Sequence, residues 1–301
     1  MVACPRRTTA WLRRCRPRVA GYPVRVRLRV DFGYDGSEFS GWASQPGLRT
    51  VEETLAQAWG TILRQSPPRL TVAGRTDAGV HARGAVCHLD LDDASYEALP
   101  ARSHRSPADA AVRRLNGVLP RDVVIRRVAR AAEGFDARFS ATSRRYSYRL
   151  CDDPATLDPI RRRDTVLVKH PVDVGLMDAA ARNLLGLNDF AAFCKRREGA
   201  TTVRTLLDYR WTREPDGTVT ATVLADAFCH SMVRSLVGVV LPVGEGRRSV
   251  QWPEQVLRDR SRHPAVTVMP PHGLCLEEVT YPPDDELAAR AAQSRRTREP
   301  L

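Results

Sequence analysis

The sequence predicts an α+β protein in which one order of elements, β-α-β-β-α-β, occurs twice along the 301-residue chain. Three observations indicate this. Apolar and charged residues alternate strictly over 24–32, which is the period of a half-buried strand. The motif Thr50-x-x-Glu53 is a capping box, which marks the start of a helix. After about residue 134 the strand and helix signals recur in the same order, although the residues themselves do not repeat.

The first half is expected to span 24–133. Its predicted elements are a strand at 24–32, a helix from Thr50 to about Gln65, strands at 70–74 and 85–91, a helix at 106–115 that ends near Asn116-Gly117, and a strand at 123–128. A turn containing Gly74 and Gly79 links the two middle strands.

The second half is expected to span 134–283. Its predicted elements are a strand at 145–150, a helix at 174–185, strands at 204–212 and 218–224, a helix at 230–243 and a last strand at 274–281, with an additional loop at 195–202 and a short helix at 253–260. Each half therefore has the order of a ferredoxin-like, split β-α-β unit. We expect mixed or antiparallel sheets flanked by helices, with a central basic cleft between the two halves.

The two ends of the chain have a different composition from its body. Residues 1–23 are rich in arginine and contain no acidic residue, which predicts a disordered basic arm, with a transit peptide as the alternative. Residues 284–301 are polar and are expected to form a disordered tail.

The net charge of +12 indicates a polyanionic partner. Nucleic acid is favoured over an anionic membrane surface, because the basic residues form clusters along the chain rather than one amphipathic helix. Lys169 and Lys195 are the only lysines, so the alternative for part of the arginine content is a GC-rich coding bias. No apolar run is long enough to span a bilayer, and no contact with a membrane is expected.

The seven cysteines show no CxxC motif and no regular spacing, so we expect neither a zinc site nor a disulfide framework. Reduced thiols of this kind indicate a cytoplasmic protein. The chain also contains no P-loop, no GxGxxG after a strand and no zinc deaminase signature. No cofactor and no metal are therefore expected.

Asp77 is the leading candidate for chemistry, because it lies in the glycine-bracketed turn after the strand at 70–74. The alternative is that this turn only closes a hairpin. Arg234 lies in an otherwise apolar helix, where a buried guanidinium needs an acidic partner, unless its side chain reaches solvent at the edge of the helix. Such a cation close to Asp77 would keep the carboxylate ionised. Tyr146 and Tyr148 are same-face neighbours on a basic strand, where they either stack on an unpaired base or pack in the core; the core is favoured for Tyr148.

These motifs resemble those of the TruA family of tRNA pseudouridine synthases over roughly residues 24–283. The matching segments are Tyr34-Asp35-Gly36, Gly41-Trp42, Gly74-Arg75-Thr76-Asp77-Ala78-Gly79-Val80-His81, Ala137-Arg138-Phe139-Ser140, Arg145-Tyr146-Ser147-Tyr148, His230-Ser231-Met232-Val233-Arg234, Val237-Gly238 and Gly273-Leu274. Two departures are Ala43, where the family often has glutamine, and Asp136, where histidine is common.

The resemblance implies an isomerase that converts uridine to pseudouridine at positions 38, 39 and 40 of the anticodon stem-loop of tRNA, without a cofactor. Asp77 matches the catalytic aspartate, a nucleophile or a general base, and Arg234 matches the arginine paired with it. Tyr146 matches the tyrosine that stacks on the target base, Arg75 the arginine of base flipping, and Leu274 a position near the uracil pocket. The resemblance also implies a homodimer whose RNA groove uses both subunits.

Two other functions remain open from the sequence. The first is a non-catalytic RNA-binding or tRNA-folding protein that has the groove without the activity. The second is a hydrolase that uses Asp77 on a nucleoside and releases free uracil. An isomer of unchanged mass as product would distinguish a synthase from both.

Overall fold

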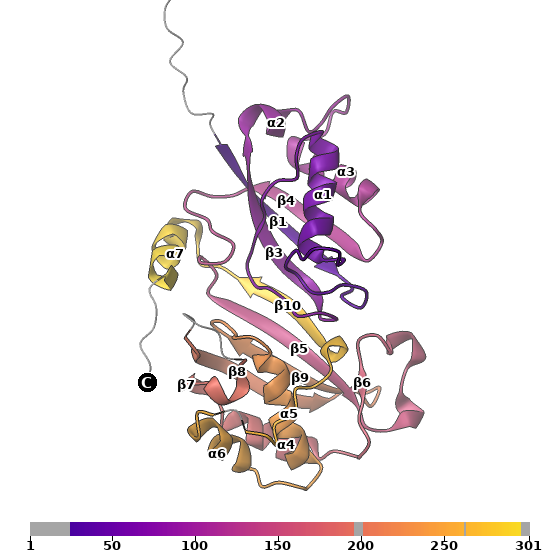
Figure 1. Ribbon diagram of the computed structural model, residues 1–301, viewed down its shortest axis with the longest axis vertical. Coiled ribbons are helices and arrows are strands. Elements are labelled where there is room, and N and C mark those ends of the chain that lie inside the picture. The colour runs from indigo at the N-terminus through magenta and orange to yellow at the C-terminus, as the bar shows by residue number, and fades with distance from the viewer. Residues whose placement is uncertain (1–24, 196–200, 262, 296–301) are drawn as a thin grey trace, which may run out of the picture.

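A ten-stranded mixed sheet runs through the whole molecule (Figure 1). The computed structural model describes residues 25–195, 201–261 and 263–295, so the expected N-terminal arm and most of the loop at 195–202 lie outside the described residues. The strands follow the order β4-β1-β3-β10-β5-β9-β8-β7, with β2 beside β3 and β6 beside β5. Together with the seven α-helices of the described residues, this sheet confirms an α+β protein.

The first half contains the predicted elements and one additional helix. They are β1 (Arg25–Tyr34), α1 (Val51–Leu63), β2 (Thr71–Val72), β3 (His81–Asp92), α2 (Asp93–Glu97), α3 (Pro107–Val118) and β4 (Val123–Arg130). Helix α3 continues through the predicted stop at Asn116-Gly117. The Asn116 side-chain amide exchanges two 2.8 Å hydrogen bonds with the backbone of Ile125 in β4, which satisfies the asparagine within the helix.

The hydrogen bond predicted from the capping box at the start of α1 does not form. Thr50 does occupy the N-cap position of α1, but its side chain makes no capping hydrogen bond. Its hydroxyl is buried instead. The acidic side chain that contacts the preceding loop is Glu52, which accepts a 3.0 Å hydrogen bond from the Ser44 amide.

The second half contains the predicted order of elements with short additions. Its strands and α-helices are β5 (Ser143–Cys151), β6 (Val166–Leu167), α4 (Val174–Arg182), β7 (Gly186–Asp189), β8 (Val203–Arg213), β9 (Val219–Ala225), α5 (Met232–Gly244), α6 (Trp252–Arg258), β10 (Leu274–Thr280) and α7 (Leu287–Arg295). Figure 1 shows α1 and α3 over the strands of the first half, and α4, α5 and α6 over those of the second. Buried apolar side chains between helices and sheet form the core.

The tail expected to be disordered over 284–301 is helical at 287–295, where α7 lies, and residues 296–301 lie outside the described residues. Leu287 and Ala291 are buried on one side of this helix. The Ser140 hydroxyl donates a 3.1 Å hydrogen bond to the Leu287 carbonyl, and Arg295 forms a 3.1 Å ion pair with Asp136. These contacts attach α7 to the start of the second half.

Strand β10 joins the two halves into one sheet. It pairs antiparallel with β5 and parallel with β3, where Cys275 lies opposite His81 and Leu276 opposite Ala82. The expectation of two separate sheets is therefore wrong, because hydrogen bonding continues across the junction.

The expectation of unpaired thiols is wrong for two of the cysteines. Cys194 and Cys229 form a disulfide bond with Cα atoms 5.8 Å apart. The fold brings them together across 35 residues, a separation that has no diagnostic spacing in the sequence. The cysteines at 87, 151 and 275 are free and buried. Within the described residues, no helix has the length and hydrophobicity needed to cross a membrane.

Candidate active site

The turn that contains Asp77 connects β2 to β3 and is closed by a 3.2 Å hydrogen bond from the Val80 amide to the Asp77 carbonyl. Gly79 occupies the third position of this turn with φ of +77°, a conformation that favours glycine. The Trp42 amide donates a 3.1 Å hydrogen bond to the Thr76 carbonyl, and the Tyr34 and Thr76 hydroxyls lie 2.7 Å apart. The backbone on the N-terminal side of Asp77 is therefore fixed from two directions.

Three side chains at the start of α5 contact the Asp77 carboxylate. Arg234 Nη1 lies 3.3 Å from Oδ2, and the Ser231 hydroxyl donates a 3.2 Å hydrogen bond to the same oxygen. His230 Nε2 lies 3.2 Å from Oδ1. The Asp77 side chain keeps 26% of its surface exposed, so the carboxylate is fixed by these contacts and still accessible to a ligand.

Arg234 is paired with an acid and does not extend from the helix edge into solvent. Its side chain is only 17% exposed, and its Nε donates a 2.6 Å hydrogen bond to the Met269 carbonyl. The segment before Met269 runs directly against the helix at Gly238, where an added Cβ would lie 1.7 Å from the Thr267 carbonyl oxygen. Helix α5 and this segment together hold the guanidinium at Asp77.

Tyr146 lies on β5 in the middle of the sheet, between Leu276 of β10 and Val223 of β9. Its ring packs edge-to-face on Phe228 with centroids 5.1 Å apart. A Cβ built at Gly74 would lie 3.9 Å from the Tyr146 hydroxyl, so this tyrosine borders the Asp77 turn. Burial raises the pKa of Tyr146 well above its usual range, which keeps the phenol neutral.

The structure does not bring all the predicted site residues into contact. Arg75 is exposed, two residues before Asp77. Leu274 is buried at the start of β10, opposite Tyr148 in the ladder. Tyr148 is a core residue whose hydroxyl donates a 2.7 Å hydrogen bond to the Pro270 carbonyl.

Two contacts of Asp77, those from His230 and Ser231, were not predicted from the sequence. Only their position in the sequence could have indicated these contacts, because both residues immediately precede α5, the helix that carries Arg234. Ser231 lies three positions before Arg234, but its backbone is left-handed rather than helical, so helical spacing alone does not predict that the two side chains reach the same group.

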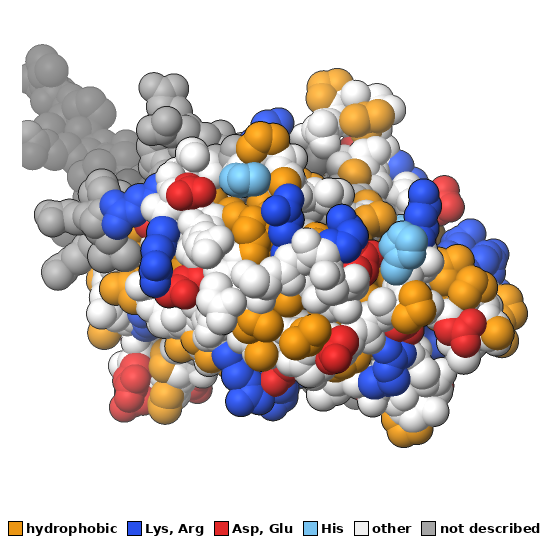
Figure 2. Space-filling view, turned by 90° about the horizontal axis from the view of Figure 1, so that it is seen from below, with side chains coloured by type: hydrophobic (Ala, Val, Ile, Leu, Met, Phe, Trp, Pro, Cys, Tyr) orange, Lys and Arg blue, Asp and Glu red, His pale blue; other side chains and the backbone are white. Residues whose placement is uncertain are grey.

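Part of the basic character serves the fold rather than a partner. Arg144 is buried and donates hydrogen bonds to the carbonyls of Ala73, Arg138 and Asp226. Burial lowers its pKa from the ordinary arginine value. Its neighbour Arg145 pairs with Glu278. Figure 2, the view from below, shows Lys and Arg side chains dispersed among acidic and apolar ones rather than gathered in one patch.

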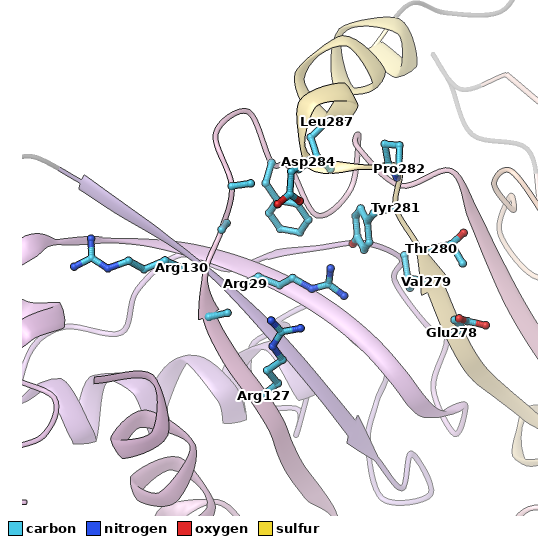
Figure 3. Close-up of a pocket in the computed structure, with 14 residues that line it drawn as sticks. Arg29, Arg127, Arg130, Glu278, Val279, Thr280, Tyr281, Pro282, Asp284 and Leu287 are labelled. Atoms are coloured by element: carbon cyan, nitrogen blue, oxygen red, sulfur yellow. The ribbon is translucent and has the colours of Figure 1, made fainter. Parts of the chain in front are cut away.

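A cavity of about 430 Å³ lies at the other end of β10, next to α7 (Figure 3). Arg29 and Arg127 point into it, whereas Arg130 extends away. The Arg29 guanidinium lies 4.8 Å from the centre of the Tyr281 ring and forms an ion pair with Asp31. None of the predicted site residues lines this cavity.

No group of three or more metal-ligating side chains occurs in the part of the chain that the structure describes. The site instead consists of a partly exposed carboxylate, a guanidinium and two further polar side chains beside a buried tyrosine ring. A fixed carboxylate of this kind can act as a nucleophile or as a base, and an adjacent aromatic ring can stack on a nucleobase.

Comparison with known proteins places these features in one family. Residues 180–282 match the family model described as tRNA pseudouridine synthase. The tRNA pseudouridine synthase A of Frankia casuarinae is 56% identical over 275 residues, which cover 91% of this chain and 96% of that protein. The proteins of the same name from Streptomyces griseus and Mycobacterium leprae are 52% and 47% identical, over 92% and 90% of this chain and 95% and 94% of their own length.

Proposed function

The chain belongs to the TruA family of tRNA pseudouridine synthases, which are isomerases, and we propose that it modifies uridines 38, 39 and 40 in the anticodon stem-loop of tRNA. The observation that carries the proposal is the ion pair between Asp77 and Arg234 next to the ring of Tyr146. It joins an accessible carboxylate, a guanidinium that orients it, and an aromatic ring for a base.

In the proposed reaction, Asp77 acts as the nucleophile at C1′ of the target ribose. The bond between C1′ and N1 breaks as a bond from the carboxylate to C1′ forms. The uracil then rotates, and its C5 displaces the carboxylate from C1′. C5 loses its proton and N1 gains one, so the product has the mass of the substrate. This chemistry requires no cofactor.

Access to C1′ requires that the uridine leave the helical stack, at a cost of a few kcal/mol. We assign Tyr146 to stacking on the flipped base, because its ring borders the Asp77 turn. The exposed Arg75 is assigned to the flipping of the base, two residues from the nucleophile. Leu274 is assigned to the apolar wall of the uracil pocket, on the strand next to that of Tyr146.

The architecture supports a site at the junction of the two halves. The strand orders β4-β1-β3-β2 and β10-β5-β9-β8 are those expected of two ferredoxin-like halves, at 24–133 and 134–283. Asp77 comes from the first and Arg234 from the second, which suggests a central basic cleft at this junction. From family membership we further infer a homodimer whose groove for tRNA uses both subunits, in the cytoplasm.

The test is pseudouridine formation in anticodon stem-loop RNA by an Asp77→Asn variant. We expect the rate to fall by a factor of about a thousand or more, because asparagine is not a nucleophile. Asp122→Asn is the control, since Asp122 pairs with Arg49 on the surface, and it should keep the original rate. Undiminished product from Asp77→Asn would contradict the proposal. Free uracil from the unaltered protein would indicate a hydrolase, and binding without product a non-catalytic RNA-binding protein.

A further inference from the structure

The two oxygens of the Asp77 carboxylate have unequal surroundings. Oδ2 accepts hydrogen bonds from two donors, the Ser231 hydroxyl at 3.2 Å and Arg234 Nη1 at 3.3 Å. Among the described residues, Oδ1 has one contact, His230 Nε2 at 3.2 Å. Because each carboxylate oxygen offers about two acceptor positions, Oδ2 is filled while Oδ1 keeps one lone pair.

The side chains that contact the two oxygens also differ in their exposure to solvent. The Arg234 side chain is 17% exposed and is also bonded to the Met269 carbonyl, so it cannot readily leave Oδ2. The His230 side chain, in contrast, is 48% exposed. The Oδ1 side of the carboxylate is therefore the side from which a ribose can approach.

Ser231 reaches Oδ2 from an unusual backbone conformation. It is the N-cap residue of α5 with φ of 62° and ψ of 9°, in the left-handed region that residues other than glycine rarely adopt. Several contacts keep this segment in place: the Met232 amide donates to the Cys229 carbonyl, the Lys195 amide donates to the His230 carbonyl, and Cys229 is bonded to Cys194. Strained residues persist where the surrounding structure imposes them, often at functional sites.

We propose that Ser231 and His230 are positioning residues that orient Asp77 so that Oδ1 is the oxygen that attacks C1′. Ser231 and Arg234 hold Oδ2 as the spectator oxygen. His230 Nε2, 3.2 Å from Oδ1, fixes the rotation of the carboxylate without filling the position that C1′ must occupy. The proposal rests on the proposed function, in which Asp77 is the nucleophile.

Ser231→Gly separates catalysis from folding, because glycine adopts a positive φ freely and lacks only the hydroxyl. We expect single-turnover pseudouridine formation at saturating stem-loop RNA to slow about tenfold to a hundredfold, the effect of losing one hydrogen bond to a charged group. The KM should change less than twofold, and thermal stability should stay equal or rise. Ala101→Gly is the matched control, since Ala101 also has a positive φ, of 52°, and should keep its rate.

His230 is tested with a pair of variants. His230→Ala removes the side chain that contacts Oδ1 and should slow the same step about tenfold or more, whereas His230→Gln keeps a polar N–H group of similar reach and should restore most of the rate. If Ser231→Gly and His230→Ala both retain the original single-turnover rate while Asp77→Asn is inactive, the positioning proposal fails and the proposed function stands. If Asp77→Asn is fully active, the proposed function fails and the positioning proposal fails with it.

Discussion

His88 is a buried histidine that accepts a 3.0 Å hydrogen bond at Nδ1 from the Ala137 amide. Burial lowers the pKa of His88 below its usual value, and Arg27 contributes in the same direction. Below about pH 6.5 the unfolded chain therefore takes up a proton at this position that the folded chain resists. The free energy of unfolding should decrease as the pH falls from 7 to 5. Urea unfolding at several pH values measures this.

His88→Asn is the control for this effect, because an asparagine side chain can also accept the hydrogen bond but does not titrate. The pH dependence of its unfolding free energy between pH 7 and pH 5 should be shallower than that of the original protein. Equal slopes for the two proteins would show that His88 takes no part.

At the scale of single residues, the sequence predicted the part of the site that depends on charge in an apolar setting. Arg234 in an apolar helix was expected to need an acidic partner unless its side chain reached solvent, and Asp77 in a glycine-bracketed turn was the leading acidic candidate. The contacts of His230 and Ser231 could not be predicted in the same way, because they depend on the left-handed backbone of Ser231. The sequence gives no indication of a left-handed backbone at position 231, because serine rarely adopts this conformation.

At the scale of elements, the close approach between α5 and the Thr267 carbonyl links packing to the site. Gly238→Ala places a methyl group where only a hydrogen atom fits, and we expect destabilisation by about 1–3 kcal/mol. The displaced segment contains Met269, whose carbonyl accepts from Arg234, so the rate of pseudouridine formation should also fall. Chemical denaturation and the stem-loop assay measure the two effects.

Gly117→Ala is the matched control, because Gly117 lies in α3 and a Cβ there meets no atom within 4 Å. This variant should gain up to about 1 kcal/mol in unfolding free energy through helix propensity, with the rate unchanged. A loss of stability in Gly117→Ala, or none in Gly238→Ala, would contradict the packing that the structure shows.

The elements that could be predicted are those with strong local patterns, such as the alternation that gives β1. The errors have tertiary causes. Asn116 and Gly117 stay helical because the Asn116 amide binds β4, and Thr50 lacks its capping hydrogen bond although its sequence fits the motif. Helix α7 buries only Leu287 and Ala291, too few apolar positions for a clear helical pattern.

At the scale of the whole molecule, the net charge of +12 predicts tRNA binding that weakens steeply with salt. If four or more phosphates are neutralised, the slope of log affinity against log salt concentration should be about −3 or steeper. Arg75→Gln should reduce this slope by about 1, because Arg75 is exposed beside Asp77. Filter binding between 50 and 300 mM salt measures it.

Arg182→Gln serves as the control for the salt series, since Arg182 pairs with Asp178 on the surface of α4, and its slope should equal that of the original protein. A flat response of the original protein would exclude the arginines as the tRNA surface.

The continuity of the sheet could not be predicted from the sequence. The parallel junction consists of two residue pairs, which are too few to leave a recognisable pattern in β10 or β3.

The central position of β10 also bears on how the chain is made. Asp77 and Arg234 are separated by 157 positions, and the last strand to leave the ribosome is the one that closes the middle of the sheet. At 5–20 residues per second, the edge of β3 at His81 waits roughly ten seconds or more for its partner. During translation the first half therefore presents an unpaired strand edge, which a neighbouring nascent chain can occupy. Activity arises only when synthesis is nearly finished, so a truncated product would be folded in part and catalytically silent.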